Sequence, residues 1–378
     1  MARKKRLRSA EETAYEQACR QWNGKPYYSL DCYLKQQFGQ KIYKVAIDGG
    51  MTCPNRDGTK GTRGCSFCSA GGSGEFAVSR TISEKSGIPT ALNTGCSDEA
   101  AVCQTFHTDR SHEAAFYRNT PDPERIRRGI VTRQLDEGIS HLKTGHKYCG
   151  DNYIAYFQSY SNTYAPVPYL RALYTEAIAH PETAALSIAT RPDCFSPEIY
   201  DLLSECQSQK PVWIELGLQT MHDVTAHAIG RGYPLSCFEA AVRELQDRNI
   251  PVIVHVILGL PGEDHARILE TIRYLNQLGI SGIKLQLLHI LKGTTMAEDF
   301  QKGRLTPLTK DEYIAILLDC IAHLSPDIVI HRITGDGPAD LLLAPTWSLN
   351  KREILNTIAH QMKTQHLYQG CRLNNEGR

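Results

Sequence analysis

Short apolar runs alternate with amphipathic stretches along this chain from about residue 42 onward. Seven runs are strongly apolar and rich in β-branched or aromatic residues, and they cover 42–47, 152–158, 185–190, 212–218, 252–259, 283–289 and 328–333. Such runs are typical of strands that are covered on both faces, as in parallel sheets. The alternation therefore predicts an α/β fold of repeated βα units, with a sheet that is open or closed into a barrel.

The stretches between these runs predict helices. In 196–207 the apolar residues recur on one helical face, and Ser196-Pro197 stands where a helix would begin. Gly279 follows another such stretch, as a C-terminal cap glycine does. Further helices are expected over 126–142, 238–245 and 268–278. In folds of this class, ligands bind beyond the C-terminal ends of the strands, so we expect the functional site there.

One segment departs from the alternation. Residues 79–123 are polar with weak periodicity, and a loop of this length in a compact domain is usually functional or disordered. We predict three parts: an N-terminal extension over 1–40, a barrel over 41–335 that contains this insertion, and a C-terminal helical tail over 336–378.

Composition narrows the class of protein. The 378 residues suffice for one large α/β domain with appendages, and 42 Lys and Arg nearly balance 41 Asp and Glu. Any contact with nucleic acid must therefore come from a local patch. The basic run at residues 3–8 is one candidate, although a solvated tail is the favoured interpretation. No apolar run has the length of a signal peptide or membrane helix, so we expect a cytoplasmic protein without membrane contact.

Three cysteines follow the first predicted strand in the loop "CPNRDGTKGTRGCSFC": Cys53, Cys65 and Cys68. Thirteen cysteines, an odd number, do not suggest a secreted disulfide framework. Thiolates are the ligands of iron–sulfur clusters, which normally take four. Three protein ligands would leave one iron open to another molecule, as catalytic metal sites keep one position open.

Two other uses of these cysteines, a zinc ribbon and a redox pair, fit the sequence less well. A zinc ribbon would need a second CxxC, and Cys65–Cys68 is the only one in the chain, although His107 and His112 could complete a site. A thioredoxin-like redox pair would open a helix without a third cysteine upstream. The residue types favour a cluster. Cys96 and Cys103 could form an extra metal site in the insertion, but no tight spacing supports it.

The loop resembles a known family. The stretch "DGGMTCPNRDGTKGTRGCSFC" is similar to the cluster loop of the radical SAM proteins of the YhcC/YtqA family, relatives of the Elongator catalytic subunit and of oxygen-independent coproporphyrinogen oxidase. The resemblance covers most of residues 25–350 in order, through "YIAYFQSYSNTYAP", "SIATRPDC", "VWIELGLQT", "GLPGE", "GIKLQLLHILKGT" and "LLAPTW".

The resemblance implies a partial (β/α)6-type radical SAM barrel and an enzyme. Cys53, Cys65 and Cys68 would hold a [4Fe–4S] cluster, whose fourth iron would bind S-adenosylmethionine. Reductive cleavage would give a 5′-deoxyadenosyl radical that takes a hydrogen atom from a substrate. A flavodoxin- or ferredoxin-like electron donor is the expected partner.

Cofactor-binding residues are expected near the cluster loop and at strand ends. Phe67 lies between the ligand cysteines and would cover cluster or adenine, or else belong to the core. Gln158, Ser159 and Tyr160 end the second strand, where radical SAM proteins bind the methionine amino group. They stand in place of the Gly-Gly-Glu often found there, which leaves the contact residues open.

Three charged or polar residues on later strands complete the candidate site. Arg191 follows the third strand and would clamp a carboxylate as a catalytic and cofactor-binding residue, or equally pair with Asp193. Glu215 lies inside an apolar strand, where a carboxylate is costly unless partnered, so we predict a catalytic role. Gln219 lies at the end of that strand as a further cofactor contact.

The substrate is less well specified. The related Elongator subunit makes tRNA the first candidate partner, with wobble-uridine side-chain modification as the reaction. The segment 25–44, with interleaved Tyr, Phe and Lys, fits a nucleic-acid contact, although a strap packed on the barrel fits nearly as well. The alternatives are a radical SAM enzyme acting on a porphyrin-like small molecule, or a non-catalytic, metal-stabilised nucleic-acid-binding module.

Overall fold

A computed structural model describes residues 10–72, 129–145, 150–335 and 337–373. The chain divides into two compact units. The first unit comprises Met1–Ile42, Leu216–Ile229 and Pro251–Arg378, and the second comprises Tyr43–Glu215 and Gly230–Ile250. The basic run at residues 3–8 and the predicted insertion, with Cys96, Cys103, His107 and His112, lie outside the described residues.

Each predicted apolar run overlaps one strand of a sheet whose order follows the sequence. Among the described residues this sheet has seven strands in the order β1-β2-β3-β4-β5-β6-β8. Their bounds are Tyr43–Ile47, Tyr153–Phe157, Thr183–Thr190, Val212–Gln219, Val252–Leu258, Gly282–Leu287 and Val329–Arg332. The α/β prediction is thus confirmed, because apolar runs of four to eight residues identify buried strands well.

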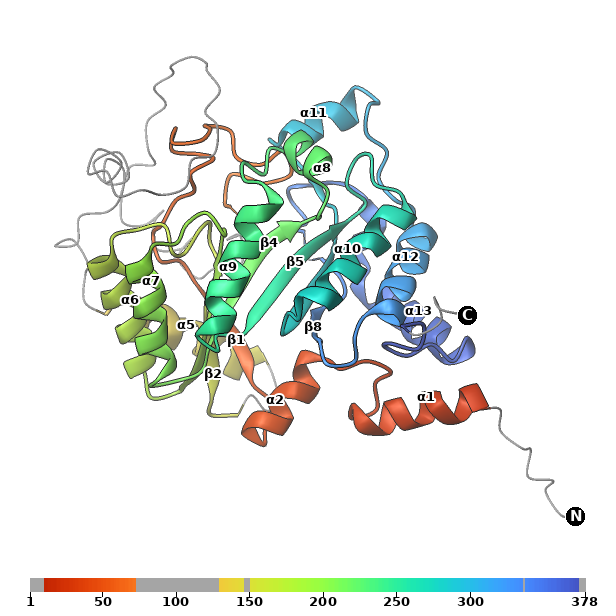
Figure 1. The fold of residues 1–378 in the computed structure, drawn as a ribbon, viewed down its shortest axis with the longest axis horizontal. Coiled ribbons are helices and arrows are strands. Elements are labelled where there is room, and N and C mark those ends of the chain that lie inside the picture. Colours follow the sequence, from red (N-terminus) through yellow and green to blue (C-terminus); the bar gives the residue numbers. More distant parts are fainter. Residues whose placement is uncertain (1–9, 73–128, 146–149, 336, 374–378) are drawn as a thin grey trace, which may run out of the picture. The chain divides into compact units, whose positions relative to one another are not determined.

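In the second unit, β1, β2 and β3 pair in parallel with Ala46, Tyr156 and Ser187 in register. Helix α5 (Ile130–Gly145) contacts β1, and α6 (Val167–Ala179) contacts β3. Helix α7 (Pro197–Gln207) packs beside α6 (Figure 1). Phe157 of β2 packs edge-on against Tyr174 of α6, at 5.3 Å between ring centroids. Because side chains alternate along a strand, Tyr156 lies on the opposite face from Phe157. A further helix, α9, spans Leu235–Asp247.

In the first unit, β5, β6 and β8 are parallel, and α10 (His265–Leu278) packs beside α12 (Lys310–His323), as Figure 1 shows. Asp264 caps α10 through the backbone N–H of Arg267, and the helix ends at Gly279 with φ 69°, the glycine expected there. A capping box of Thr309 and Glu312 starts α12.

Among the described residues, the other elements include the helix expected in the C-terminal tail and several that the sequence did not predict. Strands β7 (Ile290–Leu291) and β9 (Leu342–Ala344) form a small antiparallel sheet. The predicted N-terminal extension contains α1 (Ala10–Gln21) and α2 (Leu30–Phe38), and the predicted tail contains α13 (Lys351–Thr364). The remaining short helices are α8 (Asp223–Ala228), α11 (Thr295–Gln301) and the 3-10 helix η2 (Thr346–Leu349).

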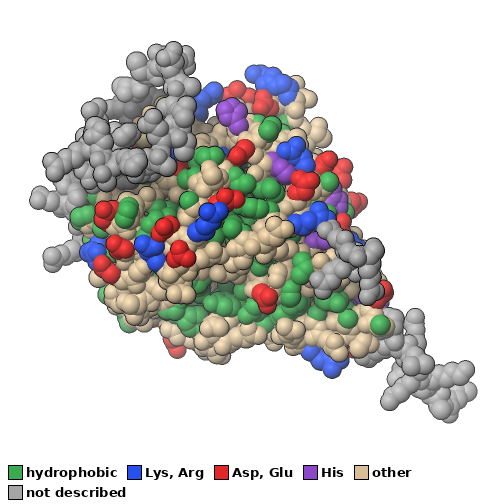
Figure 2. All heavy atoms as spheres, viewed as in Figure 1, with side chains coloured by type: hydrophobic (Ala, Val, Ile, Leu, Met, Phe, Trp, Pro, Cys, Tyr) green, Lys and Arg blue, Asp and Glu red, His purple; other side chains and the backbone are tan. Residues whose placement is uncertain are grey.

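Charged side chains of both signs are interspersed on the face shown in Figure 2. Ion pairs between helix-surface residues include Arg171 with Glu205 and Arg248 with Glu244. A surface patterned in this way offers no broad field of one sign. Within the described ranges, no helix has the length and apolar character needed to cross a membrane.

Candidate active site

The three cysteines of the predicted cluster loop lie in one tightly folded segment after β1. The backbone N–H of Arg56 donates to the carbonyl of Cys53 at 2.8 Å, and that of Cys68 donates to the carbonyl of Cys65 at 2.9 Å. The Arg56 guanidinium also donates to the carbonyl of Cys68 at 2.9 Å. Local turns and one arginine therefore hold the three thiols within the same loop.

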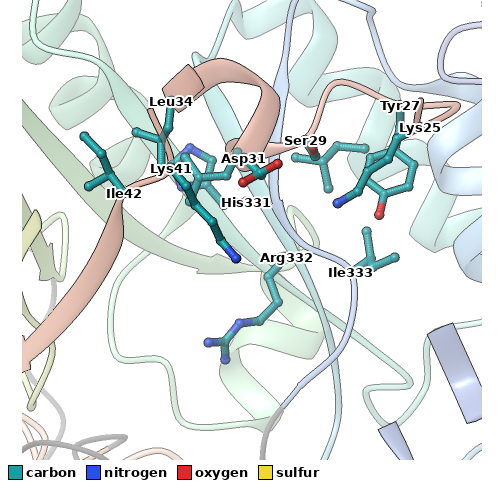
Figure 3. Close-up of a pocket in the computed structure, with 12 residues that line it drawn as sticks. Lys25, Tyr27, Ser29, Asp31, Leu34, Lys41, Ile42, His331, Arg332 and Ile333 are labelled. Atoms are coloured by element: carbon teal, nitrogen blue, oxygen red, sulfur yellow. The ribbon is translucent and has the colours of Figure 1, made fainter. Parts of the chain in front are cut away.

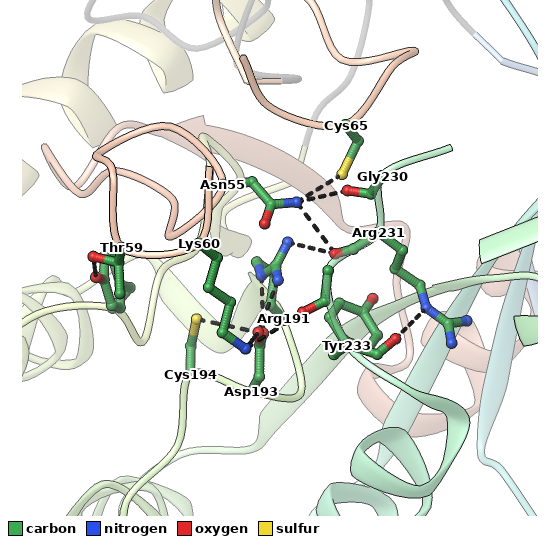
Figure 4. A network of polar contacts seen from close by, with 12 residues as sticks. Asn55, Thr59, Lys60, Cys65, Arg191, Asp193, Cys194, Gly230, Arg231 and Tyr233 are labelled. Carbon is green, nitrogen blue, oxygen red and sulfur yellow. Dashed lines mark hydrogen bonds and ion pairs between the residues drawn. The ribbon is translucent and has the colours of Figure 1, made fainter. Parts of the chain in front are cut away.

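Asn55 connects this loop to the segment that follows α8. Its buried amide Nδ2 donates to the sulfur of Cys65 at 3.4 Å and to the carbonyls of Gly230 and Arg231 at 2.8 and 3.2 Å (Figure 4). Gly232 has φ 81°, and a Cβ there would lie 2.6 Å from the amide oxygen of Asn55. Glycine is needed at this position for both reasons. Sequence reasoning missed Asn55, because nothing marks it among the polar residues of the loop.

Arg191 and Asp193 form a buried two-pronged ion pair beside the loop. The guanidinium Nε and Nη2 donate to the two carboxylate oxygens at 2.9 and 2.7 Å, and Lys60 of the cluster loop adds a contact to Asp193 at 2.6 Å. Burial acts to lower the pKa of Arg191, but Asp193 outweighs it and holds that pKa well above the ordinary value. Of the two interpretations of Arg191, pairing with Asp193 is therefore observed.

A second arginine, Arg231, and Tyr233 pack against this ion pair, and these four residues are called here the Arg191 group. The guanidinium carbons of Arg191 and Arg231 each lie 4.8 Å from the centroid of the Tyr233 ring, a cation–π distance. Arg231 is buried and donates from Nε to the carbonyl of Tyr233, while Arg191 donates to the carbonyl of Arg231 at 3.0 Å (Figure 4). Burial raises the pKa of Tyr233, so its hydroxyl stays neutral. The short sequence "GRGY" (230–233), with two glycines at positive φ, was the only available signal for this segment.

The residues at the end of β2 lie against the far end of the cluster loop. Tyr160 has φ 60°, its N–H and hydroxyl donate to the carbonyls of Gly72 and Ala70, and its ring lies 5.8 Å from the Arg56 guanidinium. A Cβ on Gly72 would lie 2.2 Å from that ring. Ser159 is buried beside it, and Gln158 donates its backbone N–H to β1.

Glu215 is fully buried and partnered by three strands. Its carboxylate pairs with Lys44 at 2.5 Å and accepts from the hydroxyls of Ser187 at 2.7 Å and Tyr156 at 2.9 Å. These groups lie on the sheet face opposite to Phe157 and the helices that contact it. The partners that the sequence required for Glu215 are therefore present.

The two remaining predicted residues are placed differently. Phe67 is half-buried between the ligand cysteines, outside the fully buried core. Gln219 ends β4 with φ 63° and belongs to the first unit, whereas the other predicted site residues belong to the second. The second unit thus brings together the cluster loop, the end of β2 and the Arg191 group.

The donor set fits an iron–sulfur cluster. All three cysteines are free thiols, and burial raises the pKa of Cys65 to about 11. Adjacent donors, the Asn55 amide among them, are of the kind that tune such clusters through hydrogen bonds to sulfur. Within the part of the chain that is described, no three His, Cys, Asp or Glu side chains gather around a single metal-ion position.

Replacing Asn55 by leucine is expected to lower the reduction potential of a bound cluster. The variant loses the N–H donor to the Cys65 sulfur, and hydrogen bonds to cluster sulfurs raise the potential by stabilising the reduced form. It also leaves the carbonyls of Gly230 and Arg231 without this donor, at a cost of about 1–3 kcal/mol in stability. Redox titration followed by electron paramagnetic resonance measures the potential.

Asn276→Leu is the matched control. Asn276 bonds two backbone groups, the carbonyl of His323 and the N–H of Ser325, without any contact to a ligand cysteine. It should lose similar stability while leaving the potential unchanged. Equal potentials in wild type and Asn55→Leu would show that the amide does not act on the cluster.

Comparison with known proteins places the chain in a family. The radical SAM superfamily model matches residues 58–275, and the radical SAM C-terminal domain model matches residues 280–364. The chain is 38% identical to YtqA of Bacillus subtilis over 92% of both proteins. It is 34% identical to YhcC of Escherichia coli over 84% of this chain and 86% of that protein.

Two more distant similarities involve only part of the chain. Elp3 of the archaeon Methanocaldococcus infernus has a similar fold, with TM-score 0.55, 17% identity and coverage of 66% of this chain and 64% of that chain. The tRNA uridine(34) acetyltransferase of Dehalococcoides mccartyi is 28% identical over 163 residues, 42% of this chain and 35% of that protein. The fold matches the barrel that the resemblance implied. The chain belongs to the radical SAM superfamily, whose enzymes use a [4Fe–4S] cluster and S-adenosylmethionine.

Proposed function

We propose that this radical SAM enzyme modifies the side chain of a wobble uridine in tRNA. The observation that carries the proposal is the similarity of part of the chain to a tRNA uridine(34) acetyltransferase. The likeness in fold to an archaeal Elp3 is consistent with it. The match to the acetyltransferase covers only about a third of that protein, so the shared chemistry would be the radical step.

Each part of the site has a proposed role. Cys53, Cys65 and Cys68 would hold the cluster, which supplies the electron that cleaves S-adenosylmethionine to a 5′-deoxyadenosyl radical. Phe67 would shield the cluster or adenine. The further contacts to S-adenosylmethionine would come from strand ends, at Gln158, Ser159, Tyr160, Arg191 and Gln219.

We propose structural roles for Arg191 and Glu215. Both are engaged in buried ion pairs, so we propose that Arg191 positions the cluster loop through Asp193 and Lys60. Glu215 would hold Lys44 and Tyr156 on the sheet face opposite to the helices, and a direct catalytic role for either residue stays a prediction.

The test of the tRNA proposal adds substrate to the reconstituted enzyme under anaerobic conditions. Unfractionated tRNA should raise the yield of 5′-deoxyadenosine, and mass spectrometry of digested nucleosides should show a changed wobble uridine. Reduced flavodoxin or ferredoxin should replace dithionite as the electron donor. If cleavage proceeds but tRNA changes neither the yield nor its nucleosides, a small-molecule substrate takes its place.

A further inference from the structure

The first unit contains a pocket of about 280 Å³ that lies away from the cluster loop in sequence. Buried Leu34, Ile42, Ile330 and Ile333 form part of its lining. Its walls come from the segment before α2, the residues that precede β1, and the end of β8. Polar and charged residues complete the lining, and convergent polar groups beside apolar ones are what fixes a ligand's orientation in a binding site.

Three cationic side chains line this pocket from three separate segments. Figure 3 shows Lys41 and Arg332 extending toward one end, while Lys25 lies with Tyr27 at the other. The one acidic side chain of the lining, Asp31, pairs with Lys35 at 2.9 Å. A concave site with an excess of positive charge focuses the field and concentrates anionic ligands. The pocket is therefore suited to an anion.

Tyr27 adds an aromatic wall. The Lys25 amine lies 5.6 Å from the centroid of the Tyr27 ring, and burial raises the pKa of Tyr27 to about 12, so the hydroxyl remains a donor. Aromatic rings next to Lys and Arg are the arrangement that holds a nucleotide, with the base against the ring and the phosphate against the cations.

The wall that carries Lys25 and Tyr27 is fixed to the rest of the unit. Ile330 of β8 donates its N–H to the carbonyl of Tyr28 at 2.7 Å, and Ser29 forms a parallel bridge with Ile330. Buried Gln369 accepts from the N–H of Tyr28 at 2.9 Å and donates its own N–H to the carbonyl of Pro26. A site held in this way does not have to be ordered when the ligand binds.

We propose that this pocket, named here the Lys25–Arg332 pocket, binds the phosphate ester of a nucleotide, either free or within an RNA strand. The planar Arg332 guanidinium suits two phosphate oxygens, and the two lysines supply point charges. The proposal is independent of which substrate the radical site modifies, because binding is measured without S-adenosylmethionine.

The test compares charge-reversed variants of the full chain. Lys25→Glu and Lys41→Glu should weaken binding by about tenfold. The probes are uridine 5′-monophosphate, followed by calorimetry, and fluorescein-labelled single-stranded oligouridine, followed by anisotropy. For the oligouridine, each lost phosphate contact should reduce the salt dependence by about 0.7 in log K against log salt. The probe that responds identifies free nucleotide or RNA as the source of the phosphate.

Two controls keep the proposal falsifiable. Lys302→Glu makes the same charge change at an exposed lysine outside the pocket and should bind within twofold of wild type. Uridine, which lacks the phosphate, should bind far more weakly than its monophosphate. The proposal is overturned if neither phosphate probe binds, if Lys25→Glu and Lys302→Glu behave alike while thermal unfolding shows both folded, or if uridine binds as tightly.

Discussion

Asp193→Ala is expected to lower the free energy of unfolding by about 3–5 kcal/mol, the usual cost of removing one partner of a buried ion pair. The Asp193 side chain is 4% exposed and that of Arg191 is 9% exposed, so water cannot replace the lost carboxylate. The variant would leave the Arg191 guanidinium and the Lys60 amine without this counter-charge. Arg231, which contacts the same Tyr233 ring as Arg191, adds a further positive charge nearby. Urea unfolding followed by circular dichroism measures the loss.

An exposed pair provides the control for Asp193→Ala. Asp201 is 70% exposed and lies 3.8 Å from Arg248, so Asp201→Ala should cost about 1 kcal/mol or less. Equal losses of stability in the two alanine variants would contradict the proposed stabilisation by the buried Arg191–Asp193 ion pair.

The stability that Asp193 contributes depends on pH. Burial acts to raise the pKa of Asp193, but Arg191 and Lys60 outweigh it and lower that pKa below the usual value. A lowered carboxyl pKa contributes stability above the unfolded-state pKa, about 3.9, and the contribution is lost as pH falls through the folded-state value. The difference between wild type and Asp193→Ala should therefore be complete at neutral pH and shrink below about pH 4.

Glu215→Ala is expected to cost a similar amount, about 3–5 kcal/mol. The Glu215 side chain is fully buried, and its removal leaves the Lys44 amine and the hydroxyls of Tyr156 and Ser187 without their shared acceptor. Thermal or urea unfolding measures the loss.

A double-mutant cycle separates the structural role of Glu215 from a catalytic one. Lys44→Met alone leaves a buried carboxylate without its cation, whereas Lys44→Met with Glu215→Gln removes both charges and should recover about 1–3 kcal/mol. If Glu215 only holds its neighbours, the stable double variant retains cleavage of S-adenosylmethionine. A folded, cluster-loaded double variant with no cleavage, beside a Lys44→Met single variant that still cleaves, would support the catalytic prediction for Glu215.

The strands and most of the longer helices could be predicted from the sequence because their signals are local. Each strand coincides with a predominantly apolar run, and Gly279 marks a helix end through its own backbone preference. The pairing of β7 with β9 could not be predicted, since it joins runs of two and three residues that are far apart in the chain.

The site residues that are close in sequence could likewise be predicted, whereas those joined only by the fold could not. The three cysteines stand within sixteen residues, so their spacing alone indicated a shared ligand. Asn55 and Arg231 are separated by 176 positions and meet only through the fold, and the same holds for Lys44 and Glu215, 171 positions apart. The burial cost of a carboxylate predicted that Glu215 has partners, but not which residues they are.

The most direct test of the account is cluster loading and cofactor cleavage in the reconstituted chain. Purified anaerobically, reduced and given S-adenosylmethionine, the wild type should hold about four irons per chain and release 5′-deoxyadenosine. A Cys53→Ala/Cys65→Ala/Cys68→Ala variant should do neither. Zinc in place of iron, or a loaded wild type that releases no 5′-deoxyadenosine, would contradict the assignment of this loop as the centre of a radical SAM enzyme.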